Sequence, residues 1–381
     1  MHIAILTDGI YPYVIGGMQR HSFYLAKFLA AAGVQVDLYH ANQSQSDISK
    51  LEGFSEDEKQ NIRSFVIEFP VFGPTPGHYI RESYEYSLRI WKVFKKERYP
   101  DFIIIKGFSG WELLNQKSKG ELLPPVGINF HGYEMFQKQP DFRSWVKSRL
   151  LLRSPVLFNV KNADYLFSYG GKITDVILSL GIAKNRIIEI PTGISADWLN
   201  ESPSVSGSIR KFVFCGRYER RKGVEELGTV LKKMVREKKE FEFHFIGPIP
   251  EKKQIHSDRI IYHGLIKDNV KLKKLLSEMD ILVCPSHSEG MPNVVMEGLA
   301  SGLAIIASDA GATSVMVNGE NGWLVSPGNI TSLQKAMEGG MNIDSRLLSG
   351  KKYAAVNEVK QKFLWDKIAA QTILAIEEKI K

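Results

Sequence analysis

Two glutamates eight residues apart, Glu289 and Glu297, stand at either end of a stretch that joins a loop to a helix start. An apolar strand pattern ends at Cys284, and a helix is predicted to begin at about Pro292, because proline is tolerated in a first helical turn. Glu289 therefore lies in the loop and Glu297 in the second turn, with the free backbone amides of about residues 291–294 between them. This order of carboxylate, amide donors and carboxylate suits a ligand that carries hydroxyl groups on both sides of an anion.

A second group of residues is basic. Another strand pattern runs into Gly216, which is followed by Arg217 and, five residues later, by Lys222. Two cations over the edge of a sheet suit a diphosphate, and a basic helix start opposes the helix dipole unless an anion compensates it. Arg220 and Arg221, in the same loop, also fit simple solvated charges.

Two further positions come from the first half of the chain. Gly16 and Gly17 precede a predicted helix, where bare backbone can approach a ligand, although a simple turn fits them as well. His131 follows a strand pattern and fits either a ligand contact or an ordinary hydrogen-bonded histidine. The sequence contains no Asp-x-Asp pair and no His/Cys cluster with metal-ligand spacing, so it suggests no bound metal.

The elements that must position these residues alternate between short β-rich runs and helical patterns, which is typical of βα units around a parallel sheet. A Ser/Pro/Gly-rich stretch at 191–209 divides them into two doubly wound α/β halves. We therefore expect a domain at 1–190, a linker at 191–209 and a second domain from 210. The runs expected as strands are 2–7, 34–40, 64–69, 102–106, 126–130 and 165–168 in the first half, and 211–216, 241–247, 260–264, 281–286 and 304–308 in the second.

Composition limits the class of protein. The 381 residues are 44% hydrophobic and 24% charged, as in ordinary globular proteins. The formal charge of +8 is shared equally by the two halves, so neither is a nucleic-acid-binding basic domain. Cys215 and Cys284 each end an apolar run and are predicted to be core thiols. The sequence shows neither a signal peptide nor a membrane-spanning run, and we expect a cytoplasmic protein.

Together these motifs resemble the retaining glycosyltransferases of family 4, which have the GT-B fold. The resemblance rests on the Gly16-Gly17 helix start, on Gly216-Arg217 with Lys222, and on the Glu289 to Glu297 element, and it covers essentially the whole chain in the expected order. It implies two Rossmann-like domains facing each other across a cleft, with the acceptor side at 1–190, the donor domain at 210–364 and a C-terminal helix at about 365–381 that returns to the first domain.

The resemblance also implies an activity and a role for each residue. The donor is a nucleotide-diphosphate sugar, favoured as a UDP-sugar, which is a substrate and not a cofactor, and the acceptor is a glycan or a lipid-linked glycan. Arg217 and Lys222 neutralise the diphosphate without a metal, Glu297 binds the ribose and Glu289 orients the donor sugar. His131 points at that sugar from the first domain, and Gly16-Gly17 admits the donor phosphate or the acceptor. The remaining predicted substrate-binding residues are Gly216, Gly290, Met291, Pro292, Asn293 and Val294.

Two departures from the family pattern and several rival functions accompany this interpretation. Many relatives carry Phe-Gly after the first Glu-Gly, where this chain has Met291-Pro292, and many carry a histidine in the loop where this chain has Lys106-Gly107, to which we assign no catalytic role. The rivals are a GT-B nucleotide-sugar epimerase, a sugar phosphorylase and a non-catalytic nucleotide-binding protein. A dehydrogenase is disfavoured because the dinucleotide fingerprint is missing.

A basic segment at 143–161 suggests where the acceptor is found. It holds five basic residues and no acidic one, interleaved with apolar side chains and Trp145. Such a segment can lie on an anionic membrane surface; a core helix with solvated cations, in which Leu150 to Leu152 pack on the sheet and Pro155 interrupts the helix, fits equally well. The five basic residues are Arg143, Lys147, Arg149, Arg153 and Lys161.

Overall fold

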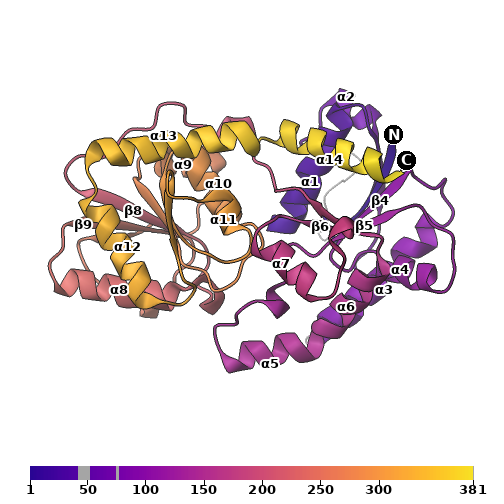
Figure 1. The fold of residues 1–381 in the computed structure, drawn as a ribbon, viewed down its shortest axis with the longest axis horizontal. Coiled ribbons are helices and arrows are strands. Elements are labelled where there is room, and N and C mark those ends of the chain that lie inside the picture. Colours follow the sequence, from indigo (N-terminus) through magenta and orange to yellow (C-terminus); the bar gives the residue numbers. More distant parts are fainter. Residues whose placement is uncertain (42–51, 74–76, 381) are drawn as a thin grey trace.

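The computed structural model describes residues 1–41, 52–73 and 77–380, without the side chains at 143–145, 147 and 148. It contains two parallel sheets, each flanked by helices, in two halves that lie side by side (Figure 1). The predicted fold class, two Rossmann-like α/β domains, is therefore confirmed.

The first sheet has seven strands in the order β3-β2-β1-β4-β5-β6-β7, all parallel. Along β1, alternate residues enter different apolar clusters on the two faces of the sheet: Ile3 and Ile5 on one, Ala4 and Leu6 on the other. The strands are β1 His2–Leu6, β2 Gln35–His40, β3 Ile62–Val66, β4 Phe102–Lys106, β5 Val126–Asn129, β6 Tyr165–Ser168 and β7 Ile187–Glu189.

The second sheet has six parallel strands in the order β10-β9-β8-β11-β12-β13. Successive strands are added on one side of β1 and then, from β4 onward, on its other side; the same switch occurs between β8 and β11 in the second sheet. Open α/β sheets bind ligands at such switch points, beyond the carboxyl ends of the strands. The strands are β8 Arg210–Cys215, β9 Phe241–Ile246, β10 Ile260–Tyr262, β11 Ile281–Cys284, β12 Ala304–Ser308 and β13 Gly322–Val325.

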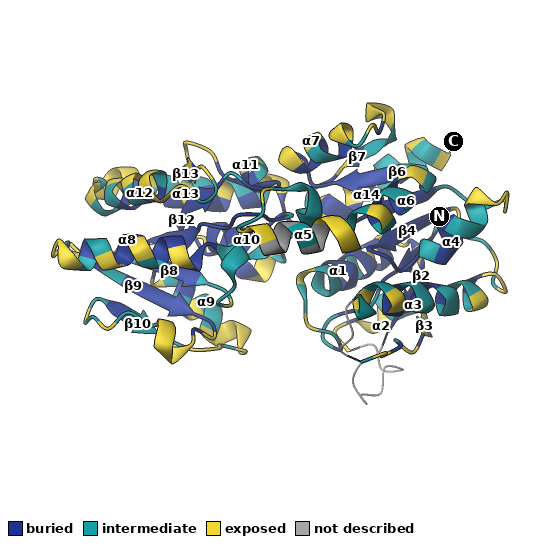
Figure 2. Ribbon diagram, turned by 90° about the horizontal axis from the view of Figure 1, so that it is seen from below, coloured by how far each residue is buried: buried dark blue, intermediate teal, exposed yellow. Residues whose placement is uncertain are grey.

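Helices cover both sheets and leave the strands as the buried interior (Figure 2). In the first half they are α1 Gly17–Ala31, α2 Glu56–Gln60, α3 His78–Phe94, α4 Trp111–Ser118, α5 Phe142–Leu151, α6 Arg153–Asn162 and α7 Lys172–Ser179. In the rest of the chain they are α8 Val224–Arg236, α9 Asn269–Ser277, α10 Asn293–Ala300, α11 Thr313–Met316, α12 Ile330–Asn342, α13 Ser345–Lys362 and α14 Trp365–Ile380.

The C-terminal helix α14 packs on the first half, against α1, while α13 lies along the second half (Figure 1). The Trp365 ring stacks on Tyr24 of α1, with ring centroids 5.7 Å apart. Where the chain crosses between the halves, Ile194 N donates to the Phe363 carbonyl at 2.8 Å. This hydrogen bond joins the two segments that connect the halves. The helix that the family resemblance implied at about 365–381 corresponds to α14.

Three local expectations need correction. The strand expected at 64–69 is β3, which is shifted toward the N-terminus and ends at Val66. The basic segment is interrupted at Leu152, between α5 and α6, and not at Pro155, which lies in the first turn of α6 where proline is tolerated. Leu150 does not pack on the sheet, since its side chain is 75% exposed; only Leu152 packs against the core.

Candidate active site

A cleft of about 520 Å³ lies between the carboxyl edges of the two sheets. Its walls come from the loops after β1, β5 and β6 on one side and from the loops after β8 and β11 on the other. Nearly all the residues singled out from the sequence line it: Gly17, His131, Gly216, Arg217, Lys222, Glu289, Gly290, Met291, Pro292, Asn293 and Val294. Gly16 and Glu297 are not among its lining residues.

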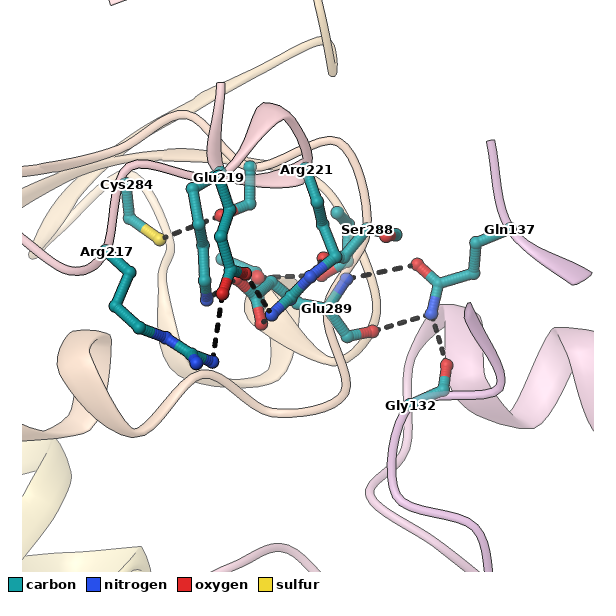
Figure 3. Close-up of polar contacts among 12 residues, drawn as sticks. Gly132, Gln137, Arg217, Glu219, Arg221, Cys284, Ser288 and Glu289 are labelled. Atoms are coloured by element: carbon teal, nitrogen blue, oxygen red, sulfur yellow. Dashed lines mark hydrogen bonds and ion pairs between the residues drawn. The ribbon is translucent and has the colours of Figure 1, made fainter. Parts of the chain in front are cut away.

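The shortest ionic contact in the cleft joins Lys222 to Glu289. The Lys222 ammonium lies 2.6 Å from Glu289 Oε1, and the two side chains are 21% and 8% exposed. Figure 3 shows Glu289 at the centre of this polar network. The pair brings the loop after β8 against the loop after β11, which are neighbouring strands of the second sheet. The cleft therefore contains a cation and a carboxylate within reach of one ligand.

Gly223 explains how Lys222 comes so close to the end of β11. It has a φ of +69°, in the left-handed region that favours glycine, and a Cβ there would lie 2.0 Å from the Pro285 carbonyl oxygen. Lys222 ends a short 3₁₀ turn, Arg220–Lys222, and α8 begins directly after Gly223. A residue with a side chain at 223 would push the Lys222 loop away from the cleft.

The start of α10 forms one side of the cleft. Pro292 precedes the first helical residue, Asn293, as the sequence predicted. Since the first amides of a helix have no partners within the helix, Asn293 and Val294 present donors where they line the cleft. This helix start offers an anion-binding surface next to Lys222.

The three arginines of the basic loop take different positions. Arg217 is 73% exposed and lies 3.0 Å from Glu219, at the rim of the cleft (Figure 3). Arg220 is not a solvated charge, since it contacts Glu226 at 2.7 Å and His287 at 2.9 Å and thereby fastens the loop to α8. Arg221 lines the cleft, 3.6 Å from Glu289, a placement that the sequence alone did not distinguish from solvated charge.

Gln137 of the first half holds the Glu289 backbone. Its side-chain amide donates to the Glu289 carbonyl at 2.6 Å and accepts from the Glu289 N–H at 3.3 Å. The same amide also donates to the Gly132 carbonyl (Figure 3). The first half thus fixes the loop that carries the site carboxylate. This contact had no signal in the sequence, because glutamine fits any polar loop.

His131 faces the cleft from the first half and touches the opposite wall through its backbone. A Cβ on Gly290 would lie 2.8 Å from the His131 carbonyl oxygen, so only glycine allows the two loops to meet so closely. The ring bonds through Nδ1 to the Tyr169 hydroxyl, while Nε2 is buried with no hydrogen-bond partner within the described residues. Burial lowers the pKa of His131 well below its usual range, so the ring is neutral at pH 7.

Glu297 lies deeper, in contact with the first half. Its Oε1 accepts from Arg20 of α1 at 2.7 Å, an ion pair between the two halves. Both side chains line a separate cavity of about 40 Å³, next to Trp365 and Tyr24. Burial raises the pKa of Glu297, partly offset by Arg20. No motif in the sequence pairs a residue of the first helix with Glu297.

The two glycines before α1 differ in position. Gly17 lies against α10, where an added Cβ would be 3.5 Å from Asn293 Nδ2, whereas Gly16 packs on the side chain of Gln19 and does not reach the cleft. Of the two cysteines, Cys284 is buried, whereas Cys215 is partly buried: it packs against the core and also lines the cleft.

The described residues contain neither a metal-binding cluster nor a membrane-spanning helix. No group of three or more His, Cys, Asp or Glu side chains in the described ranges is placed to hold a metal ion. No helix in that part of the chain is long and apolar enough to cross a membrane.

Two family models match consecutive parts of the chain. The model described as "Glycosyltransferase Family 4" matches residues 15–198, and the one described as "Glycosyl transferases group 1" matches residues 209–341. The chain belongs to the family 4 glycosyltransferases. The first match includes the Gly17 helix start and His131; the second includes the Lys222 loop and both glutamates.

Named relatives are distant. This family 4 chain is 28% identical, over 50% of its length, to a phosphatidyl-myo-inositol mannosyltransferase of Mycobacterium leprae, of which 53% is covered. It is 25% identical, over 57% of its length, to a lipopolysaccharide 1,6-galactosyltransferase of Escherichia coli K12, of which 63% is covered. The alignments thus span about half the length of the curated relatives that the chain matches.

Solved structures show the same fold along the full chain. A sucrose-phosphate synthase from Thermosynechococcus elongatus superposes with a TM-score of 0.77 at 18% identity, covering 99% of this chain and 98% of that one. The Anabaena protein HepE, solved in complex with UDP and glucose, superposes with a TM-score of 0.67 at 15% identity, covering 99% of this chain and 100% of that one. At these identities the likeness concerns the fold alone.

Proposed function

We propose that this protein is a retaining glycosyltransferase that moves a hexosyl group from a nucleotide-diphosphate sugar to a glycan or a lipid-linked acceptor. A UDP-sugar is the favoured donor, and cell-surface polysaccharide or lipopolysaccharide synthesis is the favoured setting. The observation that carries this proposal is the Lys222–Glu289 pair at 2.6 Å, facing the start of α10 in a cleft between two domains of a glycosyltransferase family.

Transfer breaks the bond between the sugar and the diphosphate, and negative charge builds up on the departing phosphate. Lys222 and the first amides of α10 lie on one side of the cleft, where they would stabilise that charge. Arg221 and Arg217 stand further out along the same wall. These groups supply the electrostatic role of a metal ion, so we propose that transfer is metal-independent.

Glu289 is the group placed to orient the donor sugar. Its carboxylate accepts from Lys222, and its backbone is clamped by Gln137, so its position is set from both halves. His131 lies across the cleft with a neutral ring. We propose that the sugar binds between Glu289 and His131. We also propose that Glu297 binds the ribose, in which case its carboxylate accepts hydrogen bonds from both Arg20 and the ribose.

The acceptor is inferred from the relatives and from the surface of α5. Two relatives are named for lipid and lipopolysaccharide acceptors, and Phe142 and Leu150 of α5 are each 75% exposed. We propose that α5 contacts an anionic membrane on its cytoplasmic side. The side chains of Arg143, Trp145 and Lys147 lie outside the described residues.

Sedimentation with anionic liposomes at low salt tests the membrane contact. Since each cation near an anionic surface contributes about 1 kcal/mol, replacing Lys147, Arg149 and Arg153 by glutamate should abolish sedimentation and leave donor hydrolysis intact. Wild-type protein that remains in the supernatant contradicts the membrane contact and leaves a soluble acceptor.

Proton NMR of the reaction with a UDP-hexose and a screened acceptor tests the reaction type. The proposal predicts free UDP and a product with the anomeric configuration of the donor, with the rate unchanged by EDTA. An altered sugar nucleotide would indicate an epimerase, and a sugar phosphate would indicate a phosphorylase. Binding without turnover would indicate a non-catalytic protein. An inverted anomer or loss of the reaction in EDTA contradicts retention or metal independence.

A further inference from the structure

Two histidines of the first half line the cleft, and the buried Lys106 acts on both electrostatically; we call these three basic side chains, Lys106, His21 and His131, the basic pocket. Lys106 is the last residue of β4, and His131 follows β5, the next strand of the sheet. His21 comes from α1, and its ring meets that of His131 edge to face, with centroids 5.2 Å apart.

Within the described residues the basic pocket has no acidic partner. The Lys106 side chain is 2% exposed, and burial alone shifts its pKa, with no carboxylate of the described residues acting on it. His21 Nδ1 and His131 Nε2 are likewise buried without a partner among those residues. A buried cation is costly unless it is paired. The arrangement therefore leaves an unbalanced positive potential beside the cleft.

The surrounding groups do not supply the missing charge. From the loop after β1, Asp8 accepts a hydrogen bond from Gln19 and does not act on Lys106, whose pKa is shifted by burial alone. Tyr169, after β6, bonds to the His131 ring, and burial raises its pKa far above the usual value. Glu134, beyond His131, also has a raised pKa because it is buried. Desolvation lowers the pKa of Lys106 to about 7, with no opposing carboxylate.

We propose that the basic pocket binds an anionic substituent, a carboxylate or a phosphate, on one of the two sugars that meet in the cleft. This inference rests on the proposed function and names the substrate class of that same site. The two imidazole rings touch the anion, and Lys106 behind them supplies the charge. When the Tyr169 hydroxyl donates to His131 Nδ1, the ring proton stays on Nε2, the nitrogen that has no partner within the described residues.

The two possible sources of the anion are the donor sugar and the acceptor sugar. UDP-glucuronate and UDP-glucose differ only by a carboxylate in place of a hydroxymethyl group, so their affinities isolate the charge on the donor. Glucose 6-phosphate and glucose, titrated into the UDP-saturated protein, do the same for a second sugar. A charge-assisted hydrogen bond predicts about 10- to 100-fold tighter binding of the charged member of one of these pairs.

Calorimetry on the wild type and on Lys106→Met tests the proposal. We expect the charged-to-neutral affinity ratio to be high at pH 6, to fall as the pH rises through about 7, where Lys106 loses its proton, and to approach one in Lys106→Met. Lys92→Met removes the same charge from an exposed site on α3 and should leave the ratio unchanged. A merely structural lysine would alter stability without altering this ratio.

The outcomes separate the two claims. A preference within the UDP-sugar pair assigns the anion to the donor, and one within the glucose pair assigns it to the acceptor; either supports the proposal. Ratios near one for both pairs, in a protein that binds UDP, overturn the anionic subsite and leave the proposed function standing. Failure to bind UDP or any UDP-sugar overturns both.

Discussion

Replacing Lys106 by methionine should stabilise the protein near neutral pH, although it removes the only charge on a fully buried side chain of β4. Methionine has nearly the shape of lysine without its ammonium, so the apolar stem remains packed. Among the described residues no carboxylate acts on the ammonium, so the variant has no ion pair to lose. The variant therefore removes a desolvation cost and little else.

The size and sign of the effect follow from the pKa of Lys106. Burial lowers it from 10.5 to about 7 in the folded protein, and each pKa unit corresponds to about 1.36 kcal/mol. Below pH 7 the folded state carries the full cost, roughly 5 kcal/mol as an upper bound. Between pH 7 and 10.5 the unfolded chain binds one more proton than the folded protein, so wild-type stability rises with pH relative to the variant.

Denaturant unfolding at pH 6, 8 and 9.5 measures this difference. Lys106→Met should be more stable than wild type at pH 6, and its advantage should shrink by about 1.36 kcal/mol per pH unit above 7. Lys92→Met, at an exposed position of α3, should track the wild type at every pH. A variant that is less stable at pH 6, or an advantage that does not change with pH, refutes the assignment of Lys106 as an unpaired buried cation.

Three further comparisons, with five variants in all, test the site. Glu297→Gln should weaken UDP binding, whereas Glu289→Gln should depress turnover while UDP still binds; calorimetry that shows equal loss of UDP affinity in both contradicts this division of roles. Arg20→Ala leaves the buried Glu297 carboxylate without its partner and should cost about 1–2 kcal/mol of stability, a modest value because Arg20 is itself 35% exposed. The loss should be larger at pH 8, where Glu297 is ionised, than at pH 4; an equal loss at both pH values argues against the ion pair. Gly223→Ala should lower stability and turnover because its Cβ would clash with the Pro285 carbonyl oxygen. Gly228→Ala, where an added Cβ meets nothing, should leave turnover unchanged and raise stability by about 0.5–1 kcal/mol. Similar losses in both variants would reject the steric argument.

The sequence predicted much of the architecture because the local signals agree with the global fold. Apolar runs such as 102–106 read as buried strands, the Ser/Pro/Gly-rich stretch marked the crossing between halves, and Pro292 marked the start of α10. The loops at the carboxyl edges of the strands were also predictable, since parallel sheets bring those ends together. The family resemblance then assigned the Lys222 loop and Glu289 to one site.

The contacts between the halves were not predictable from the sequence. Arg20 and Glu297 lie 277 residues apart, and Gln137 carries no motif; their pairing depends on how two separate domains dock. The missing partner of Lys106 was equally hidden, because a lysine at a strand end usually reaches solvent. Local pattern places a residue on an element, but it does not reveal which charges remain uncompensated after packing.

The most direct test of the central claim is the rate of UDP release from a panel of UDP-hexoses by wild type and by Lys222→Ala. The account predicts slow release by the wild type from at least one donor, and a rate about 10²- to 10³-fold lower in Lys222→Ala, the scale for loss of one electrostatic donor to the departing group. A folded Lys222→Ala variant that releases UDP as fast as the wild type would contradict the assignment of this cleft as the site of glycosyl transfer.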